Sequence, residues 1–425
     1  MSSEWPILRL GDHVDACLGK MLDAKKNKGE PQPYLGNSNV RWGEFDLDDL
    51  AEMRFEAHED ERYSLQRGDL VVCEGGEPGR CAIWEGLPGI KIQKALHRIR
   101  PKSGFNNYYL FYWFCLAAKT GKLDPHFTGT TIKHLTGKAI ASLEVPCPPI
   151  ATQIALVNVL RSLDDRITLL RETNATLEAI AQALFKSWFV DFDPVRAKQE
   201  GRAPEGMSDA TAALFPDGFE ESELGLVPRG WRYSTVGESF ILTMGQSPPG
   251  DTYNETRDGL PFYQGRTDFG FRFPSQRVYC SAPTRIAEPG DTLVSVRAPV
   301  GDVNMALEKC CLGRGVAGLR HIRGCNSFAF YTLKGLRARF DLFDSEGTVF
   351  GSINKKDFRG LPVLSPSDDV LFAFDDIVTP IDRRVIENEE QMRTLSALRD
   401  TLLPRLISGQ LRLPEAAALI EEATA

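Results

Sequence analysis

A long segment with helical heptad spacing occurs twice in the chain, at residues 160–189 and 379–407. A shift of 218 positions places Asp164 on Asp382 and Glu172 on Glu390. In both copies the apolar residues recur at alternating spacings of four and three, the pattern of a helix that packs against another helix along its length. Helices in globular proteins average about three turns. Two helices of this length therefore predict an interhelical coiled coil.

The predicted seam of the coiled coil contains polar as well as apolar residues. Asn174 lies in the first helix and Asn388 in the second, both at positions that should be buried. A buried polar residue in a seam costs stability but fixes register and partner. The predicted seam consists of Leu163, Ile167, Leu170, Asn174, Leu177, Leu184, Ile381, Val385, Asn388, Met392, Leu395 and Leu402.

The repeat continues upstream of the helices, with a few residues of drift between blocks. The stretch GTTIKHLTGKAIASLEVPCP (129–148) corresponds to GTVFGSINKKDFRGLPVLSP (347–366), and RGDLVVCEGGEPGR (67–80) corresponds to PGDTLVSVRAPVGD (289–302). The chain is thus predicted to be an α+β protein made of two mixed α/β globular domains, each followed by a long helix. If the helices pack antiparallel, the two copies are related by an internal pseudo-two-fold.

The repeat also predicts the boundaries of the parts. They are a first globular domain at 1–150, a first spacer helix at 151–193, a polar linker at 194–228, a second globular domain at 229–368, a second spacer helix at 369–413 and an acidic tail at 414–425.

Charge is distributed unevenly along the chain. The net charge of −8 argues at first against a polyanionic partner. However, residues 1–150 hold 19 Lys and Arg against 20 Asp and Glu, and residues 229–368 hold 18 against 14. The acidity therefore belongs to the helices, linker and tail, and the globular domains are able to present basic faces.

Cellular location is predicted from cysteine usage and hydropathy. The nine cysteines are scattered and none form a C-x-x-C pair, which favours a reducing compartment over a disulfide framework or a zinc site. There is no apolar run long enough for a membrane span and no signal-peptide layout at the start of the sequence. We expect a cytoplasmic protein without a membrane partner.

Motifs for nucleotide binding, amino-group methylation and metal binding are absent from the sequence. One alternative is an enzyme built around Glu74 and Glu77 in CEGGEPGR, whose paired carboxylates resemble a general acid and base. Such a pair needs a pocket and a partner that the sequence does not reveal. The glycines favour instead a loop that approaches a ligand closely.

Loops that combine basic, amide and glycine residues occur in both globular domains. Examples are DAKKNKGEPQPY (23–34) in the first domain, and YQGRTDFGFR (263–272) and GRGVAGLRHIR (313–323) in the second. Arg and Lys bind phosphates, while Arg, Asn and Gln also make paired hydrogen bonds to purine edges. For any one lysine, an ordinary solvated loop remains the simpler interpretation. The aromatic run NNYYLFYWFCLAA (106–118) predicts a buried helix or strand and not a base-stacking surface.

Several of these stretches resemble the specificity subunit of type I restriction-modification systems. The resemblance spans residues 5–413 and is carried by PYLGNSNVRWGEFDL (33–47), GDLVVCEGGEPGRCAIW (68–84), IQKALHRIRP (92–101), GQSPPGDTYNE (245–255), PFYQGRTDFG (261–270), GTVFGSINKKDF (347–358) and QALFKSWFVDFDP (182–194). It implies that each globular domain is a target recognition domain reading one half of a bipartite, asymmetric site in double-stranded DNA. It also implies that the helices set the unread gap and dock two methyltransferase subunits.

The same resemblance implies a chain without catalytic residues, metal or cofactor of its own. S-adenosylmethionine, ATP and Mg²⁺ would belong to the methyltransferase and motor-nuclease subunits. It implies DNA contacts in the loops, for which the candidates are Lys25, Lys26, Lys28, Arg41, Glu74, Arg80, Gln93, Lys94, Thr130, Lys133, Gln246, Ser247, Tyr253, Asn254, Gln264, Arg266, Arg297, Ser352, Asn354, Lys355 and Lys356.

Two further alternatives stay open at this point. One is a specificity subunit that serves a methyltransferase without any cutting partner. The other is a scaffold that uses its duplicated coiled coil to hold protein partners and does not bind DNA. The Arg, Asn, Gln and Gly loops at equivalent places in both copies favour DNA over the scaffold.

Overall fold

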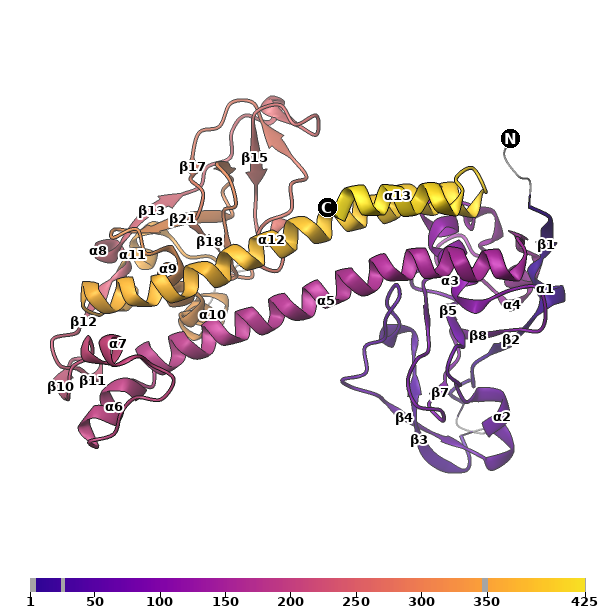
Figure 1. The fold of residues 1–425 in the computed structure, drawn as a ribbon, viewed down its shortest axis with the longest axis horizontal. Coiled ribbons are helices and arrows are strands. Elements are labelled where there is room, and N and C mark those ends of the chain that lie inside the picture. The colour runs from indigo at the N-terminus through magenta and orange to yellow at the C-terminus, as the bar shows by residue number, and fades with distance from the viewer. Residues whose placement is uncertain (1–4, 24–26, 346–350, 425) are drawn as a thin grey trace. The chain divides into compact units, whose positions relative to one another are not determined.

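The computed structural model describes residues 5–23, 27–345 and 351–424. Its internal contacts divide the chain into two compact units, residues 1–170 with 391–425 (unit 1) and residues 171–390 (unit 2). Each unit contains one globular domain and one half of each long helix (Figure 1). The two units therefore correspond to the two copies that the sequence repeat predicts.

The two long helices are α5 (Ile150–Phe189) and α12 (Asp368–Ile407), each of 40 residues. In unit 1, Arg399 of α12 donates a 2.7 Å hydrogen bond to Asp164 of α5. In unit 2, Asn388 of α12 donates a 2.7 Å hydrogen bond to Asn174 of α5. Also in unit 2, the ring centres of Phe185 of α5 and Phe374 of α12 lie 5.8 Å apart, so positions that advance along α5 meet positions that recede along α12 and the helices are antiparallel.

The predicted seam residues lie at buried or half-buried positions. In unit 1 they join the main core, where Leu163 and Leu402 are almost inaccessible to solvent. In unit 2, Val385 is buried, and Leu177 and Ile381 pack at the margin of the core. The two seam asparagines are each 1 % exposed, so they bury a polar pair that is satisfied in part by the partner helix.

The globular domain of unit 1 is built on two sheets. A four-stranded sheet has the order β2–β8–β5–β6, a three-stranded sheet has the order β4–β3–β7, and β1 pairs with β9. The strands are β1 (Ile7–Arg9), β2 (Val14–Leu18), β3 (Glu30–Leu35), β4 (Glu52–Phe55), β5 (Leu70–Cys73), β6 (Cys81–Ile83), β7 (Lys91–Ile92), β8 (Leu96–Pro101) and β9 (Glu144–Pro146). The helices are α1 (Leu10–His13), α2 (Asp60–Tyr63), α3 (Asn107–Lys119) and α4 (Gly137–Ser142).

The globular domain of unit 2 repeats this plan. A four-stranded sheet has the order β13–β21–β18–β19, a five-stranded sheet has the order β14–β16–β15–β20–β17, and β12 pairs with β22. The strands are β12 (Arg232–Thr235), β13 (Phe240–Met244), β14 (Tyr253–Asn254), β15 (Leu260–Tyr263), β16 (Tyr279–Cys280), β17 (Ile286–Ala287), β18 (Thr292–Ser295), β19 (Val303–Met305), β20 (Cys310–Leu312), β21 (Val316–His321) and β22 (Pro362–Ser365). The helices are α8 (Val236–Ser239), α9 (Asn326–Gly335), α10 (Arg337–Ser345) and α11 (Lys355–Gly360).

Equivalent hydrogen bonds relate the two domains residue by residue. The parallel pairing of Leu35 with Ile92 in unit 1 recurs as the parallel pairing of Tyr263 with Leu312 in unit 2. A two-bond Arg–Asp pair also recurs, from Arg100 to Asp69 in unit 1 and from Arg320 to Asp291 in unit 2. These correspondences set the structural alignment used below.

The aromatic run at 106–118 forms the buried helix that its composition predicts. Residues 107–119 make up α3, and Asn106 caps it by accepting hydrogen bonds from the backbone N–H groups of Tyr108 and Tyr109. Tyr109 and Phe114 are fully buried. These side chains belong to the core and are unavailable for stacking on bases.

Two segments fold although the sequence predicts a linker and a tail. Residues 194–228 contain α6 (Asp193–Gln199), α7 (Asp209–Ala213) and the hairpin of β10 (Phe219–Ser222) and β11 (Gly225–Pro228). Val195 and Phe215 pack with Trp188 in the core of unit 2. At the other end, α13 (Leu413–Thr424) belongs to unit 1 and buries Ala416 completely. Apolar residues thus anchor both segments, and in the second of them Leu413, Leu419 and Ile420 also pack against the core.

Candidate nucleic-acid interface

Loops that are distant in the sequence of unit 2 join at one edge of its globular domain. The backbone N–H of Gln246 donates to Leu312 O (2.9 Å), and that of Gly313 donates to Tyr263 O (2.8 Å). The N–H of Val296 donates to Gly315 O (2.9 Å). A further bond, from Ile353 N–H to Val296 O (3.1 Å), adds the segment before α11. We call residues 245–248, 263–265, 296–298, 312–315 and 351–354 the second loop edge.

Exposed polar side chains occupy the second loop edge. Gln246, Gln264 and Arg297 are exposed, and Arg297 forms a β-bridge with the exposed Ser352. Of the predicted candidates, these four and Ser247 therefore lie together. The arrangement combines a cation with amide and hydroxyl groups, the set that reads base edges and phosphates in DNA.

Arg314 also lies on the second loop edge, and the predicted set does not include it. It is exposed, and its Nε donates a 3.2 Å hydrogen bond to Ser247 Oγ. A Cβ on the neighbouring Gly315 would lie 2.2 Å from Gln264 O, so the close approach of these two loops requires glycine. The sequence signal that could have identified Arg314 is its position between two glycines.

Other predicted residues of the second domain have structural partners. Tyr253 donates to Pro248 O (2.8 Å), and its ring lies 4.6 Å from that of Phe262. Asn254 holds a turn by accepting from the N–H groups of Thr256 and Asp258. These contacts explain both residue types without DNA.

Three of the remaining candidates in this domain lie around α11, and the fourth forms an ion pair. Asn354 caps α11, accepting from two backbone N–H groups, and Lys355 and Lys356 are exposed in the first turn of that helix. Arg266 is paired with Asp302 at 2.6 Å. Of these four, Lys355 and Lys356 are the exposed side chains that have no ion pair or hydrogen-bond partner among the described residues.

The globular domain of unit 1 has an equivalent edge. The N–H of Lys20 donates to Ile92 O (3.0 Å), and that of Gln93 donates to Leu35 O (3.0 Å). The N–H of Glu74 donates to Ala95 O (2.8 Å). Leu135 N–H donates in turn to the carbonyl of Glu74 (2.7 Å). Residues 19–21, 35–37, 74–76, 93–95 and 133–135 form this first loop edge, connected by the same four hydrogen bonds as the second.

The first loop edge has a different set of charges. Lys94 and Lys133 are exposed on it, while Thr130 is exposed nearby. Lys20, the counterpart of Gln246, is only 3 % exposed and is paired with Glu59 at 2.5 Å. Its charge is therefore already used inside the domain.

The other first-domain candidates lie around this edge. Arg80 donates to Asn37 O (3.0 Å) and pairs with Glu77 (3.2 Å), whereas Arg41 pairs with Asp46 (3.2 Å). Lys28 is exposed beside a cavity of about 350 Å³ that the side chain of Lys20 also lines. The candidates Lys25 and Lys26 lie outside the described residues.

The two carboxylates of the proposed catalytic pair have different partners. Glu77 accepts from Trp42 Nε1 (2.6 Å) and pairs with Arg80. Glu74 Oε2 lies 4.0 Å from Nε2 of the buried His97, and neither atom has a hydrogen-bond partner within the described residues. Burial lowers the pKa of His97, although Glu74 opposes this effect. These separate environments do not favour one shared acid–base site.

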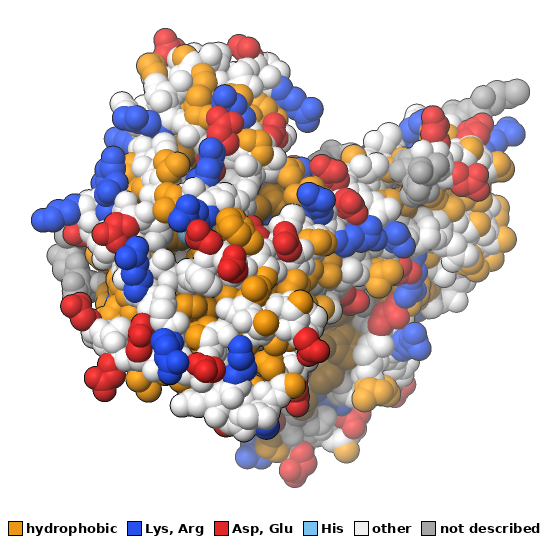
Figure 2. Space-filling model, turned by 60° about the vertical axis from the view of Figure 1, so that its left-hand side comes forward, with side chains coloured by type: hydrophobic (Ala, Val, Ile, Leu, Met, Phe, Trp, Pro, Cys, Tyr) orange, Lys and Arg blue, Asp and Glu red, His pale blue; other side chains and the backbone are white. Residues whose placement is uncertain are grey.

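Charged groups of both signs are interspersed on the face of the molecule that Figure 2 shows. On the face shown in Figure 2, Lys and Arg side chains alternate with Asp and Glu and do not merge into one basic patch. On that face the charges therefore do not form the single basic patch that is typical of many nucleic-acid-binding domains.

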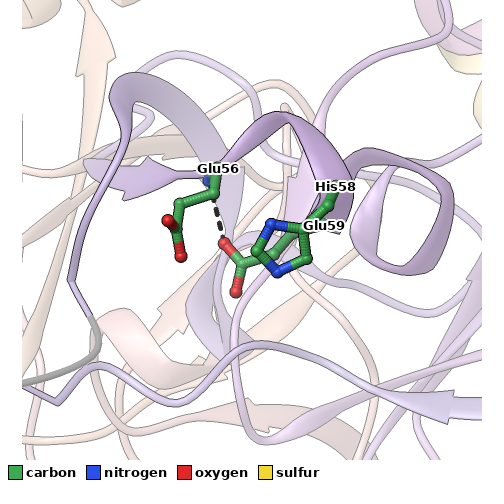
Figure 3. A group of neighbouring side chains, drawn as sticks. All are labelled: Glu56, His58 and Glu59. Carbon is green, nitrogen blue, oxygen red and sulfur yellow. Dashed lines mark hydrogen bonds between the residues drawn. The ribbon is translucent and has the colours of Figure 1, made fainter.

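One group of side chains has the composition of a metal site. Ligand atoms of Glu56, His58 and Glu59 lie within 4.8 Å of one another (Figure 3). Glu59, however, accepts the backbone N–H of Glu56 (2.9 Å) and pairs with Lys20. Burial raises the pKa of Glu59, but the bonds from Lys20 and Glu56 outweigh it and the pKa is lowered overall. Turn capping and this ion pair account for the cluster.

Comparison with known proteins identifies a single family. Residues 2–179 match the type I restriction modification DNA specificity domain. A Methanocaldococcus jannaschii protein described as the specificity subunit of a type I restriction enzyme, MjaX, is 27% identical over 96% of this chain and 94% of its own length. The HindI specificity subunit of Haemophilus influenzae is 28% identical over 66% of this chain and 72% of its own.

A solved structure has a similar fold. The specificity subunit of a type I restriction-modification system from M. genitalium aligns over 95% of this chain and 96% of its own, with a TM-score of 0.60 at 15% identity. Among the described residues, no helix combines the length and apolar character needed to cross a bilayer.

Proposed function

Since this chain belongs to the DNA specificity subunits of type I restriction-modification systems, we propose that each of its globular domains reads one half of a bipartite, asymmetric site in double-stranded DNA. The first loop edge meets one half-site and the second loop edge meets the other. The antiparallel helices set the length of the unread gap.

The observation that carries this proposal is the pair of equivalent loop edges with different side chains. The shared backbone bonds align Lys94 with Arg314 and Gly75 with Arg297. An identical scaffold thus presents a lysine and a glycine in one domain and two arginines in the other. Because Arg makes paired hydrogen bonds to base edges, whereas Lys is a point charge and Gly has no side chain, the two edges offer different contacts to their half-sites.

Partner subunits complete the proposed complex. Two methyltransferase subunits dock on the long helices, where apolar side chains remain exposed, including Ile154 and Ile180 of α5 and Phe372 of α12. These partners bring S-adenosylmethionine and methylate adenine. Motor-nuclease subunits add ATP- and Mg²⁺-dependent cleavage. This chain contributes recognition without catalysis, in the reducing cytoplasm that its nine free thiols suit.

A map of modified bases tests the proposal directly. Genomic DNA is compared between a host that carries this chain with its cognate methyltransferase and the same host without the chain. We expect a two-part methylated-adenine motif with one fixed gap, which disappears on deletion. A methylation pattern that is unchanged by the deletion contradicts the proposal.

Substitution of the charged residues on the second loop edge distinguishes a DNA-reading subunit from a protein scaffold. Replacing Arg297 and Arg314 with Ala should change the half-site attributed to the second domain and leave the first half-site intact. For binding of the complex to duplex DNA, the logarithm of the association constant should also fall linearly with the logarithm of the salt concentration, because phosphate contacts release counterions. A scaffold would show neither effect, and a methyltransferase-only system would show both without any cleavage of unmodified DNA.

A further inference from the structure

Within unit 2, one segment connects the second loop edge to the long helices. It begins at Gln264, whose backbone N–H donates to Asp268 (2.7 Å), and it ends at Arg272. Gly270 N–H and O bond to the side chain of Asn304 (3.3 and 3.0 Å), and Met305 N–H donates to Arg272 O (2.9 Å). The segment is thus held at its beginning, middle and end.

The side chain of Arg272 contacts both long helices. Its Nη2 pairs with Asp382 of α12 and lies 3.4 Å from Glu178 Oε2 of α5. It also donates to Tyr331 Oη (2.9 Å), and its guanidinium lies 3.8 Å from the ring centre of Phe330. The residue is 1 % exposed, so a cation from the globular domain is buried against a carboxylate of each helix.

Further bonds from α9 reinforce the contacts of Arg272. Ser327 donates to Asp382 (2.6 Å), whereas Tyr331 and Lys334 donate to Glu178 (3.1 and 2.6 Å). The globular domain is therefore joined to the helix pair through a network, and among its described residues Arg272 is the one that pairs with a carboxylate of each helix. Within the described residues the Nε and Nη1 atoms of Arg272 lack hydrogen-bond partners. The guanidinium makes a cation–π contact with the ring of Phe330.

The first globular domain has no such arginine. Gly36 N–H bonds to Asn39 as Gln264 N–H bonds to Asp268, and Asp46 N–H donates to Asn39 O as Ser275 N–H donates to Asp268 O. This register aligns Arg272 with a glycine, which is Gly43. At this position the first domain therefore has no side chain that could make the contacts of Arg272.

Unit 1 supplies the equivalent cation from a helix instead. Asp164, the counterpart of Asp382, accepts a 2.7 Å bond from Arg399 of α12. The 218-residue shift aligns Arg399 with Ala181 of α5, which is fully buried in unit 2. An arginine thus neutralises the helix aspartate in both units, but it belongs to the spacer in one unit and to the globular domain in the other.

We propose that Arg272 is a positioning residue that fixes the orientation of the second globular domain on the helix pair and thereby fixes the gap between the half-sites. This inference rests on the proposed function. The same segment begins at Gln264 on the second loop edge. Loss of the contacts that Arg272 makes with the helices therefore lets the DNA-facing loops shift relative to them. Recognition of the half-site itself is retained, since the loop edge keeps its own backbone bonds.

A swap variant separates positioning from stability. Ala181→Arg combined with Arg272→Gly transfers the arrangement of unit 1 to unit 2, so Asp382 keeps a neighbouring cation while the domain loses its link to both helices. Arg337→Met serves as the matched control, because it removes an arginine of the same domain whose ion pairs within the described part of the chain are with Asp302 and Asp341. Each full-length variant is expressed with the cognate methyltransferase.

The readout is methylation of reporter plasmids that carry the mapped half-sites with the natural gap or with one base pair more or fewer. We expect the swap variant to methylate the altered gaps, with the preference for the natural gap reduced by about tenfold or more, since small misplacements have large effects on reaction rates. Wild type and Arg337→Met should retain the preference. Thermal unfolding of each variant establishes that it is folded.

Each outcome has a distinct meaning. If the folded swap variant keeps the wild-type preference, Arg272 has no positioning role and the inference is wrong. If wild type itself yields no two-part motif, the proposed function is what fails. Should the swap variant not fold, Arg272→Lys keeps the charge but loses the planar guanidinium over Phe330, and an unchanged gap preference in that variant also overturns the inference.

Discussion

The two units share one fold but hold their globular domains to the long helices in different ways. In unit 1 the ion pairs between the globular domain and the helices are partly exposed: the side chains are 53% and 44% exposed in Lys119–Asp400, and 36% and 41% exposed in Glu85–Arg161. In unit 2 the Arg272–Asp382 pair is buried, at 1% and 9%. Exposed pairs contribute little and are screened by salt, whereas a buried pair is costly to break. Duplication has thus conserved the scaffold while the strength of the link between domain and helix diverged.

Breaking the buried network should produce the largest effect. Arg272→Met leaves Asp382 and Glu178 buried without their shared cation, so we expect unit 2 to lose about 3–5 kcal/mol of stability. Amide hydrogen exchange should increase in α9 and in the adjoining part of α12, with little change in unit 1. Protection that stays at the wild-type level in α9 would contradict the comparison.

The seam should also respond differently in the two units. Leu395 is 1 % exposed in unit 1, so Leu395→Asp buries an unpaired charge at a cost of at least ~3 kcal/mol. Leu177 is only half-buried in unit 2, and Leu177→Asp should cost about 1–2 kcal/mol. Urea denaturation of the single variants measures both. Equal effects would show that exposure in the seam does not determine the cost.

Asp375 makes the stability of unit 2 depend on pH. Its counterpart in unit 1 is Val157, which does not titrate. From α12 it accepts the N–H of Phe328 (2.9 Å) at the start of α9, and burial raises its pKa from 3.8 to about 6. A carboxyl with a raised folded-state pKa favours folding most when protonated. Its contribution is therefore complete below pH 3.8 and is lost as the pH rises through about 6.

Asp375→Asn removes this titration and keeps an acceptor for the helix start. Relative to wild type, the variant should gain ~2 kcal/mol of unfolding free energy between pH 4 and pH 7.5. Denaturation midpoints at the two pH values measure the difference, and subtraction cancels the carboxyls that both proteins share. A parallel pH profile for the two proteins would refute the role of Asp375.

The smallest effect is expected for Arg399→Met in unit 1. Because the pair with Asp164 is partly exposed and Tyr112 still donates to that aspartate (2.7 Å), the loss should be about 1 kcal/mol or less. The loss should shrink further in high salt. A cost as large as that of Arg272→Met would mean that exposure does not explain the difference between the units.

The repeated architecture was predictable because it depends on periodicity. Heptad spacing in the long helices and equivalent blocks upstream define two copies of one unit, and the seam asparagines pair as partners in a coiled coil do. That the predicted linker and tail fold was less predictable. Phe215 and Val227 belong to short apolar clusters in an otherwise polar stretch, and their burial is what reveals that residues 194–228 fold.

The sequence indicated which loops carry the candidate residues but not where each side chain lies, and the DNA contacts themselves stay a prediction. Gln246, Gln264 and Arg297 do meet at one edge, because the repeat places their loops at the ends of neighbouring strands. By contrast, Asn254 and Asn354 hold a turn and a helix start, roles that the same residue type fulfils without DNA. Lys20 and Arg272 show the converse, since sequence gives no sign that these charges are buried.

The division of both long helices between the units has a consequence for synthesis on the ribosome. Unit 2 is one continuous stretch, residues 171–390, and can close as soon as it emerges. Unit 1 needs residues 391–425 to cover Leu163 and Ile167. At about 5–20 residues per second, the first half of α5 waits roughly 10–45 s with that apolar face uncovered. The earliest part of the chain to be made is therefore the last to be completed, and it is the part most exposed to chaperones and misassembly.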